Sequence, residues 1–116
     1  MATYTIYHNP RCSKSRQTLA LLKEHGISPD VIEYLKTPPS ANEIAELQRK
    51  LNLSLTEMLR RKEKEFAQAG LDQPNVSDEA VYAAIAAHPI LLERPIVTCD
   101  DKAVIGRPPE NVLALL

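Results

Sequence analysis

The sequence TYTIYHNPRCSKSRQTLALLKEHG at residues 3–26 decides how the fold begins. Residues 3–8 are rich in β-branched and aromatic side chains, as in a β-strand, and the turn dipeptide Asn9-Pro10 follows them directly. From residue 13 onward the leucines recur at helical spacing, and the segment closes on basic residues and Gly26, a common end of a helix. The stretch therefore predicts a strand, a turn and a helix at about 13–25.

Two further groups of elements complete a sheet around this segment. Residues 31–35 are a short β-branched and aromatic run, and a strand, helix and strand in this order form a parallel pair with a right-handed crossover. The runs 96–99 and 103–105 predict a tight hairpin, and Pro108-Pro109 introduces a last helix. A βαβ unit followed by a ββα unit predicts an α/β fold with a thioredoxin-like mixed sheet.

Between the two halves lies a block in which only helices are predicted. Three helix starts are marked by a serine cap, the first two with a glutamate three residues later: Ser40, Ser54 and Ser77. The second helix of the block is expected to run through 60–65, and the last is expected to end at Pro89. Because no linker or repeat is present, we expect one domain, 1–116, with a helical insertion at about 40–89.

The composition limits the classes of function. The chain has 116 residues, 44% of them hydrophobic, with 14 Lys plus Arg against 15 Asp plus Glu. These values are typical of a globular domain, and the net charge of −1 gives no basic excess for nucleic acid or a membrane surface. The apolar runs are far shorter than the ~20 residues of a transmembrane helix, and the first residues do not resemble a secretory signal. We therefore expect a cytoplasmic protein without nucleic-acid or membrane partners.

Cys12 is the leading candidate for a catalytic residue. It stands between the predicted first strand and first helix, next to the cationic Arg11, Lys14 and Arg16. The positive end of a helix dipole and free backbone N–H groups commonly lower the pKa of a thiol from about 8.5 toward 3.5–7.5. The alternative is a buried structural cysteine, but the turn from a strand into a helix is where sites form. We expect a nucleophilic thiolate at Cys12.

The position of a second thiol decides how Cys12 can be reduced. Ser15 stands where a dithiol oxidoreductase has its resolving cysteine, so no local disulfide can form. Oxidised Cys12 then needs an external thiol, most simply glutathione, unless Cys99 comes within about 7 Å between Cα atoms. For Cys99, which lies in an apolar run, a core position is favoured. The threonine at position 18 disfavours a phosphatase-type loop, which would have arginine there.

His8 is the histidine that precedes the turn to Cys12. It can hold the thiolate as an imidazolium or transfer a proton, and a histidine satisfied by the backbone alone is the alternative. His25 and His88 stand near predicted helix ends, where a structural role is sufficient. One histidine and one cysteine do not complete a tetrahedral site, so we expect no metal.

Three arginines are candidates for binding an oxyanion. Arg60 begins a basic stretch, whereas Arg94 and Arg107 each precede a proline at an end of the predicted sheet. Guanidinium groups bind tetrahedral oxyanions through paired hydrogen bonds, and the alternative is exposed, solubilising arginine. Arg94-Pro95 is also a candidate for a cis bond. We expect Arg94→Ala and Arg107→Ala to weaken oxyanion binding and to leave the alkylation rate of Cys12 within a few-fold.

Five motifs, in order, resemble the glutaredoxin-coupled arsenate reductase family: HNPRCSKSRQTL, YL-x-x-PP, MLRRKE, ERPIV and IGRPPE. The resemblance covers nearly the full chain, implies a thioredoxin-like fold, and is closest to the chromosomal branch in the IGRPPE ending. It implies roles for seven residues: Cys12 as the nucleophile, His8 and Ser15 tuning the thiolate, Arg60, Arg94 and Arg107 binding the oxyanion, and Pro95 as a cis-proline facing Cys12. Arg60 is assigned rather than Arg61 because it directly follows the Met-Leu pair.

The resemblance also implies a reaction cycle. Cys12 attacks arsenate, glutathione attacks the adduct, and glutaredoxin takes the glutathionyl group while arsenite leaves. Arsenate, glutathione as a co-substrate and glutaredoxin are thus the expected partners, with no bound cofactor. One alternative is an Spx-like regulator that binds RNA polymerase, although such proteins usually have C-x-x-C where this chain has Cys12 and Ser15. A glutathione-dependent thiol reductase with another substrate, or a plain glutaredoxin, is a further alternative.

Overall fold

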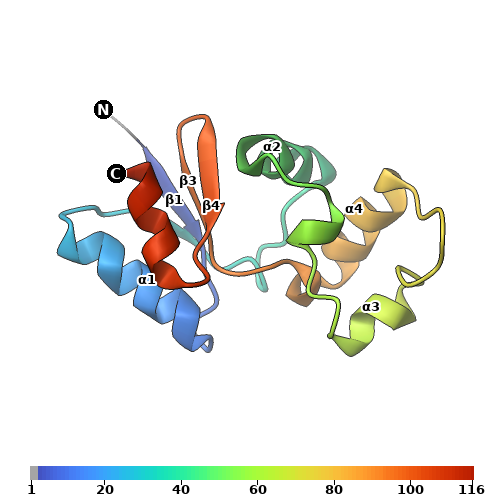
Figure 1. Cartoon of the computed structure of the whole chain (residues 1–116). Coiled ribbons are helices and arrows are strands. Elements are labelled where there is room, and N and C mark those ends of the chain that lie inside the picture. The colour runs from blue at the N-terminus through green and yellow to red at the C-terminus, as the bar shows by residue number, and fades with distance from the viewer. Residues whose placement is uncertain (1–2) are drawn as a thin grey trace. The chain divides into compact units, whose positions relative to one another are not determined.

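Strand β1 (Tyr4–Tyr7) lies inside a four-stranded mixed sheet (Figure 1). The structure is a computed structural model that describes residues 3–116. In the strand order β2-β1-β3-β4, β1 is parallel to β2 (Asp30–Ile32) and antiparallel to β3 (Ile96–Cys99), which pairs antiparallel with β4 (Lys102–Ile105). The βαβ and ββα halves share one sheet, so the predicted thioredoxin-like fold class is confirmed.

The chain forms two compact units. The first contains the sheet and consists of the described residues up to Thr37 together with Arg94–Leu116. The second, Pro38–Glu93, is built from helices and corresponds to the insertion expected at about 40–89. That residues 1–116 form a single domain stays a prediction.

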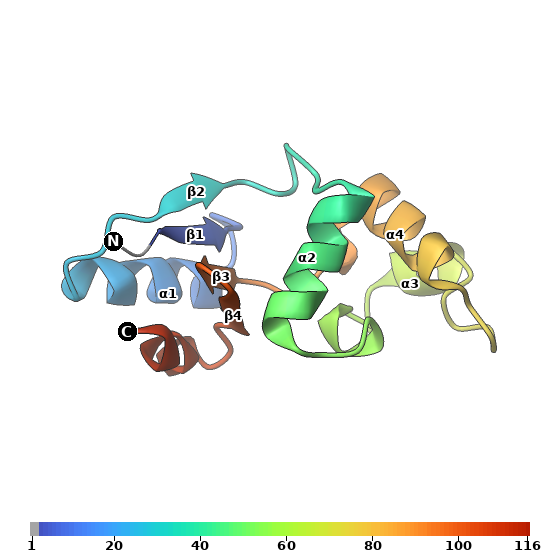
Figure 2. The same cartoon turned by 90° about the horizontal axis from the view of Figure 1, so that it is seen from above.

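The core of the first unit lies between the sheet and two helices. Helix α1 (Ser13–Glu24) and the 3-10 helix η3 (Pro109–Leu115) lie on one face of the sheet (Figure 2). Ile6 and Val97 are paired across the strands and pack against Leu22 of α1 and Val112 of η3, and all four side chains are fully buried. Burying a side chain of this size stabilises the fold by about 1.5–3 kcal/mol, so the cluster fixes α1 on the sheet.

Helix α1 ends where Gly26 predicts. Gly26 has φ +78°, a conformation that favours glycine, and its N–H donates to the carbonyl of Lys23 at 3.0 Å. The predicted second strand is partly wrong, because β2 ends at Ile32 and residues 34–36 form a turn. The last bond between the two strands runs from the N–H of His8 to the carbonyl of Ile32 at 2.8 Å, after which the chain turns toward α1, so β2 does not continue to residue 35.

Two helices of the second unit begin at their predicted serine caps. Before α2 (Ala41–Leu51), Ser40 Oγ accepts the N–H of Glu43 at 3.2 Å, and Glu43 Oε1 accepts the N–H of Ser40 at 3.2 Å. Helix α4 (Asp78–Ala87) is capped by Ser77, whose Oγ accepts the N–H of Ala80 at 3.2 Å. These caps satisfy N–H groups that have no partner within the helix, which is why the local sequence is sufficient to position both starts.

The helix predicted through residues 60–65 is wrong. Ser54 and Glu57 do form a capping box, but it opens only the 3-10 turn η1 (Thr56–Met58). Leu59 is then extended and pairs with Leu92 in an isolated antiparallel bridge, and α3 (Lys64–Gln68) begins later. Both leucines are buried, so a contact between distant residues replaces the helix that the local sequence favours.

The last predicted helix is present as the 3-10 helix η3. The side-chain amide of Asn111 donates to the carbonyls of Ile105 and Arg107, at 3.1 and 3.2 Å, and so ties the helix back to the end of β4. Among residues 3–116, the structure contains no helix with the length and apolar character needed to span a bilayer.

Candidate active site

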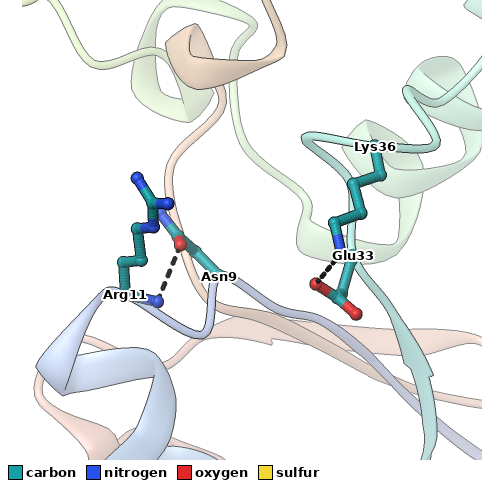
Figure 3. Close-up of polar contacts among 4 residues, drawn as sticks. All are labelled: Asn9, Arg11, Glu33 and Lys36. Atoms are coloured by element: carbon teal, nitrogen blue, oxygen red, sulfur yellow. Dashed lines mark hydrogen bonds and ion pairs between the residues drawn. The ribbon is translucent and has the colours of Figure 1, made fainter.

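The loop between β1 and α1 places Cys12 at the start of the helix. Asn9 Oδ1 accepts the N–H of Arg11 at 3.0 Å (Figure 3), and the carbonyl of Asn9 accepts the N–H of Cys12 at 3.0 Å. Such side-chain and backbone bonds make a tight turn after Asn9, which is itself buried. Cys12 consequently becomes the N-cap residue of α1, with extended backbone angles and a partly exposed side chain.

The surroundings of Cys12 favour its thiolate. Burial by itself raises the pKa of the thiol, but the backbone N–H groups of Ser15 and Lys14 and the guanidinium of Arg94 outweigh it, so the pKa lies below its ordinary value. The N–H groups are those that every helix leaves without an intrahelical partner in its first turn. The structure thus contains the backbone N–H groups at the helix start through which the sequence predicts a lowered pKa for Cys12.

Arg94, in the segment before β3, lies close to the Cys12 thiol. Its guanidinium is one of the groups that lower the pKa of the thiol, and the expectation that Arg94→Ala leaves the alkylation rate of Cys12 within a few-fold stays a prediction. Its Nε and Nη1 atoms are buried and have no hydrogen-bond partner among the described residues. Buried guanidinium N–H groups without partners are costly, and a ligand with several acceptor oxygens would satisfy them.

Tyr34 adds a third buried polar atom that lacks a partner. Its side chain is fully buried in the turn after β2, and its Oη forms no well-aligned hydrogen bond with a described residue, although Arg94 and Asn9 lie close enough to it to lower its pKa. Burial raises the pKa of Tyr34 to about 12, although the nearby guanidinium of Arg94 acts in the opposite direction, and a charge on Cys12 would raise it further. Tyr34 is thus a neutral hydroxyl close to both Arg94 and Cys12. The pattern of residues 31–35 indicates only a strand and carries no local signal for a buried hydroxyl at Tyr34.

His8 and Ser15 form a buried pair behind the loop. Ser15 Oγ lies 2.6 Å from Nδ1 of His8 and accepts the N–H of Asn9 at 3.0 Å. Burial lowers the pKa of His8 below its ordinary 6.5, against the opposing effect of the Glu33 carboxylate. The imidazole is therefore neutral near pH 7, and the alternative in which His8 holds the thiolate as an imidazolium is disfavoured. Ser15 reaches Cys12 through its backbone N–H, while its hydroxyl serves His8 and the loop.

Glu33 lies at the start of the turn that contains Tyr34. Its Oε1 is 3.5 Å from Nζ of Lys36 (Figure 3), in an ion pair whose side chains are both substantially exposed. An exposed pair of this kind contributes at most about 1 kcal/mol. The Glu33 carboxylate matters to the site because it lies near His8, where it partly offsets the lowering of the imidazole pKa by burial.

Arg60 lies in the helical unit, Pro38–Glu93. Its Nη1 is 2.8 Å from Glu63 Oε1 in a largely buried ion pair that lacks the geometry of a hydrogen bond. Arg61, which the sequence left as the other candidate, lies over the ring of Phe66, 6.0 Å from its centroid. Arg60 thus belongs to a different unit from Cys12, and its role toward an oxyanion stays a prediction.

Arg107 and Pro95 belong to the sheet unit. The Arg94–Pro95 bond, a candidate for the cis form on the sequence, is cis, and so is the bond between Arg107 and Pro108. Pro95 is buried against the segment that follows β4, where its carbonyl accepts the N–H of Gly106 at 2.8 Å. Arg107 is exposed, and its role as an oxyanion ligand stays a prediction, as does the facing of Pro95 toward Cys12.

Cys99 cannot act as a resolving thiol for Cys12 in this fold. It is a free, partly buried cysteine that pairs with Tyr4 at the beginning of β1, whereas Cys12 follows the end of that strand. The strand between Tyr4 and Tyr7 alone places the Cα atom of Cys99 roughly 10 Å away, along β1, from the end of the strand that leads to Cys12. This distance is well beyond the reach of a disulfide. Cys99 also lies at a strand end and not in the core cluster, so the core position favoured for it is only partly correct.

Comparisons with known proteins identify the family. The ArsC family matches residues 7–115 of this chain. An arsenate reductase of Neisseria meningitidis is 50% identical over 117 residues that cover all of both chains, and one of Escherichia coli is 39% identical over all of this chain and 82% of its own. A solved structure named as an arsenate reductase from Vibrio cholerae has a TM-score of 0.96 at 50% identity, covering 98% of each chain. The chain therefore belongs to the ArsC family.

Proposed function

We propose that this protein reduces arsenate to arsenite through the Cys12 thiolate, with glutathione and glutaredoxin supplying the electrons. The observation that carries the proposal is the position of Cys12 at the N-cap of α1, where Arg94 favours the thiolate and has buried N–H groups without partners. The similar proteins of Neisseria meningitidis and Vibrio cholerae are named arsenate reductases. A nucleophile next to unsatisfied cationic donors suits an anionic electrophile.

The proposed first step forms one bond and breaks one. The Cys12 sulfur donates an electron pair to the arsenic of H₂AsO₄⁻, an As–O bond breaks, and hydroxide leaves, so the product is a thiol ester of arsenate at Cys12. Arg94 counters the negative charge that thiolate and arsenate bring together. The resemblance assigns Arg60 and Arg107 to the same oxyanion.

Two thiols then complete the reduction. Glutathione attacks the arsenic adduct and displaces a second hydroxide, and the glutaredoxin thiolate then takes the glutathionyl sulfur as a mixed disulfide, which leaves the electron pair of the As–S bond on arsenic. Water finally cleaves the bond between Cys12 and arsenic, so that arsenite leaves and the thiol is regenerated. The net reaction is balanced: H₂AsO₄⁻ and two thiols give H₂AsO₃⁻, one disulfide and water. External thiols are required because Ser15 stands in the resolving position and Cys99 lies at the other end of β1. Such thiol chemistry suits a reducing compartment such as the cytoplasm.

His8 and Ser15 support the nucleophile indirectly in this proposal. The Ser15 hydroxyl holds the neutral imidazole of His8 and the N–H of Asn9, and so fixes the loop that positions Cys12. This fixed loop keeps the N–H groups of Lys14 and Ser15 directed at the sulfur. Both residues thus tune the thiolate through geometry and not through a charge.

A coupled assay tests the proposal. The purified chain is supplied with arsenate, glutathione, glutaredoxin and an NADPH-linked system that recycles oxidised glutathione, and oxidation of NADPH is followed. We expect turnover that needs arsenate, glutathione and glutaredoxin, that Cys12→Ser abolishes, and that the matched variant Cys99→Ser retains. Turnover of Cys12→Ser at the wild-type rate, or no arsenate-dependent oxidation with the wild-type chain, would refute the proposed reaction.

A further inference from the structure

The buried surroundings of Cys12 contain three polar atoms that the protein itself does not satisfy. They are Oη of Tyr34 and Nε and Nη1 of Arg94, none of which forms a well-aligned hydrogen bond with a described residue, although Asn9 and the guanidinium of Arg94 lie close to the Tyr34 hydroxyl. Most buried polar groups in proteins are paired, because an unpaired one costs about 1–3 kcal/mol. Three such atoms on two neighbouring side chains therefore call for a ligand.

The chemistry of these atoms defines that ligand. Each carries a hydrogen that it can donate, and one of the two side chains is a permanent cation. The guanidinium of Arg94 lies near the Cys12 sulfur and also near the Tyr34 hydroxyl, since it lowers the pKa of both groups where burial raises it. A group that offers acceptor oxygens, carries negative charge and lies within reach of the sulfur satisfies all of these conditions, and a tetrahedral oxyanion is such a group.

We propose that the Tyr34 hydroxyl is a substrate-binding residue, which donates a hydrogen bond to an oxygen of the oxyanion that Arg94 holds beside Cys12. The inference deepens the proposed function and rests on it for the identity of the oxyanion. Burial keeps Tyr34 in the hydroxyl form, because its pKa of about 12 lies far above neutral pH. The hydroxyl thus supplies a donor without adding a second charge to the neighbourhood of the thiolate.

The ring of Tyr34 and its hydroxyl have separable roles. The ring fills a fully buried position in the turn after β2, whereas the hydroxyl makes no well-aligned hydrogen bond within the described chain. Tyr34→Phe retains the ring and removes only the donor. Because replacing an unsatisfied buried polar group by an apolar one of the same shape is close to neutral or stabilising, we expect this variant to unfold at the wild-type temperature or above it.

Two readouts test the inference, one of which does not depend on turnover. Inorganic sulfate, an unreactive tetrahedral oxyanion, is titrated at constant ionic strength while the rate of Cys12 alkylation is measured. We expect sulfate to protect Cys12 in the wild-type chain and to protect Tyr34→Phe with an affinity roughly 10- to 100-fold lower, the usual weight of a hydrogen bond to a charged group. In the coupled assay, kcat/KM for arsenate should fall by a similar factor. The matched control, Tyr82→Phe in α4, should behave as wild type in both assays.

The outcomes separate this inference from the proposed function. If the wild-type chain reduces arsenate while Tyr34→Phe is unchanged in kcat/KM and in sulfate protection, the inference is overturned and the proposed function stands. If arsenate is not reduced but Tyr34→Phe weakens protection by sulfate, the oxyanion role of Tyr34 is supported for another substrate. Loss of thermal stability with unchanged sulfate affinity would show that the hydroxyl is structural, and would overturn the inference.

Discussion

Gly106 is the position at which one added methyl group tests how the sheet unit is packed. A Cβ atom at Gly106 would lie 2.7 Å from Thr18 Oγ1 and 3.0 Å from both Thr18 Cγ2 and Pro95 Cγ. Thr18 cannot rotate away easily, because it is β-branched, fully buried in α1, and bonded through its hydroxyl to the carbonyl of Lys14 at 2.8 Å. Gly106→Ala must therefore displace α1 from the end of β4.

The distances give the expected size of the effect. Forcing a methyl group into a close-packed core costs roughly 1–3 kcal/mol, and weakening the hydrogen bond of the Thr18 hydroxyl adds about 0.5–1.5 kcal/mol. We expect Gly106→Ala to lower the free energy of unfolding by about 2–4 kcal/mol. At roughly 4 °C per kcal/mol for a chain of this size, Tm falls by about 8–16 °C, which thermal unfolding followed by circular dichroism measures.

A double-mutant cycle identifies the cause. Thr18→Ala removes both of the Thr18 atoms that the new methyl group would meet, so in that background Gly106→Ala should cost about 1 kcal/mol or less. Gly26→Ala is the matched control: its Cβ meets nothing within 4 Å, and its φ of +78° gives it a strain of about 1–2 kcal/mol that should be equal in both backgrounds. If Gly106→Ala is as costly with Thr18→Ala as without it, the close contact with Thr18 is not the cause and the reasoning fails.

Three further predictions concern the groups around the thiol. Arg94→Gln should raise the pKa of Cys12, because it removes a cation that favours the thiolate, and the pH profile of iodoacetamide alkylation should move to higher pH, whereas the exposed Arg11→Gln should leave it in place. Burial holds the pKa of His8 below 6.5, so the unfolded chain binds a proton at this imidazole more readily than the folded chain does. The free energy of unfolding should therefore be highest above about pH 6.5 and should decline below it. Urea titrations at pH 7.5 and 5.5 measure this decline, which His8→Gln should flatten. Ser15→Ala should cost about 1–3 kcal/mol by leaving a buried N–H and an imidazole unpaired. It should also move the alkylation profile of Cys12 to higher pH, because the loop that directs the N–H groups of Lys14 and Ser15 at the sulfur is loosened; an unchanged profile would show that the hydroxyl does not tune the thiolate.

Local signals in the sequence are sufficient wherever a structural feature depends on neighbours in the chain. The start of α2 follows from the reciprocal bonds of Ser40 and Glu43, and the end of α1 follows from the left-handed conformation of Gly26. The position of Cys12 at a helix start is local in the same sense, because the turn before it is made by Asn9. The candidate nucleophile and the mixed sheet are therefore predictable from the order of residues in the chain.

Tertiary structure alone decided the features that join residues far apart in the chain. Leu59 is extended because it pairs with Leu92, a contact that overrides the helical pattern around it. Arg94 reaches the surroundings of Cys12 only because β3 pairs with β1, and Tyr34 joins them because β2 pairs with the other edge of β1. The sequence by itself determined the sulfur and its helix, since their bonds are made within a few residues; which donors surround that sulfur was decided by the sheet, because strand pairing brings together segments that no local pattern connects.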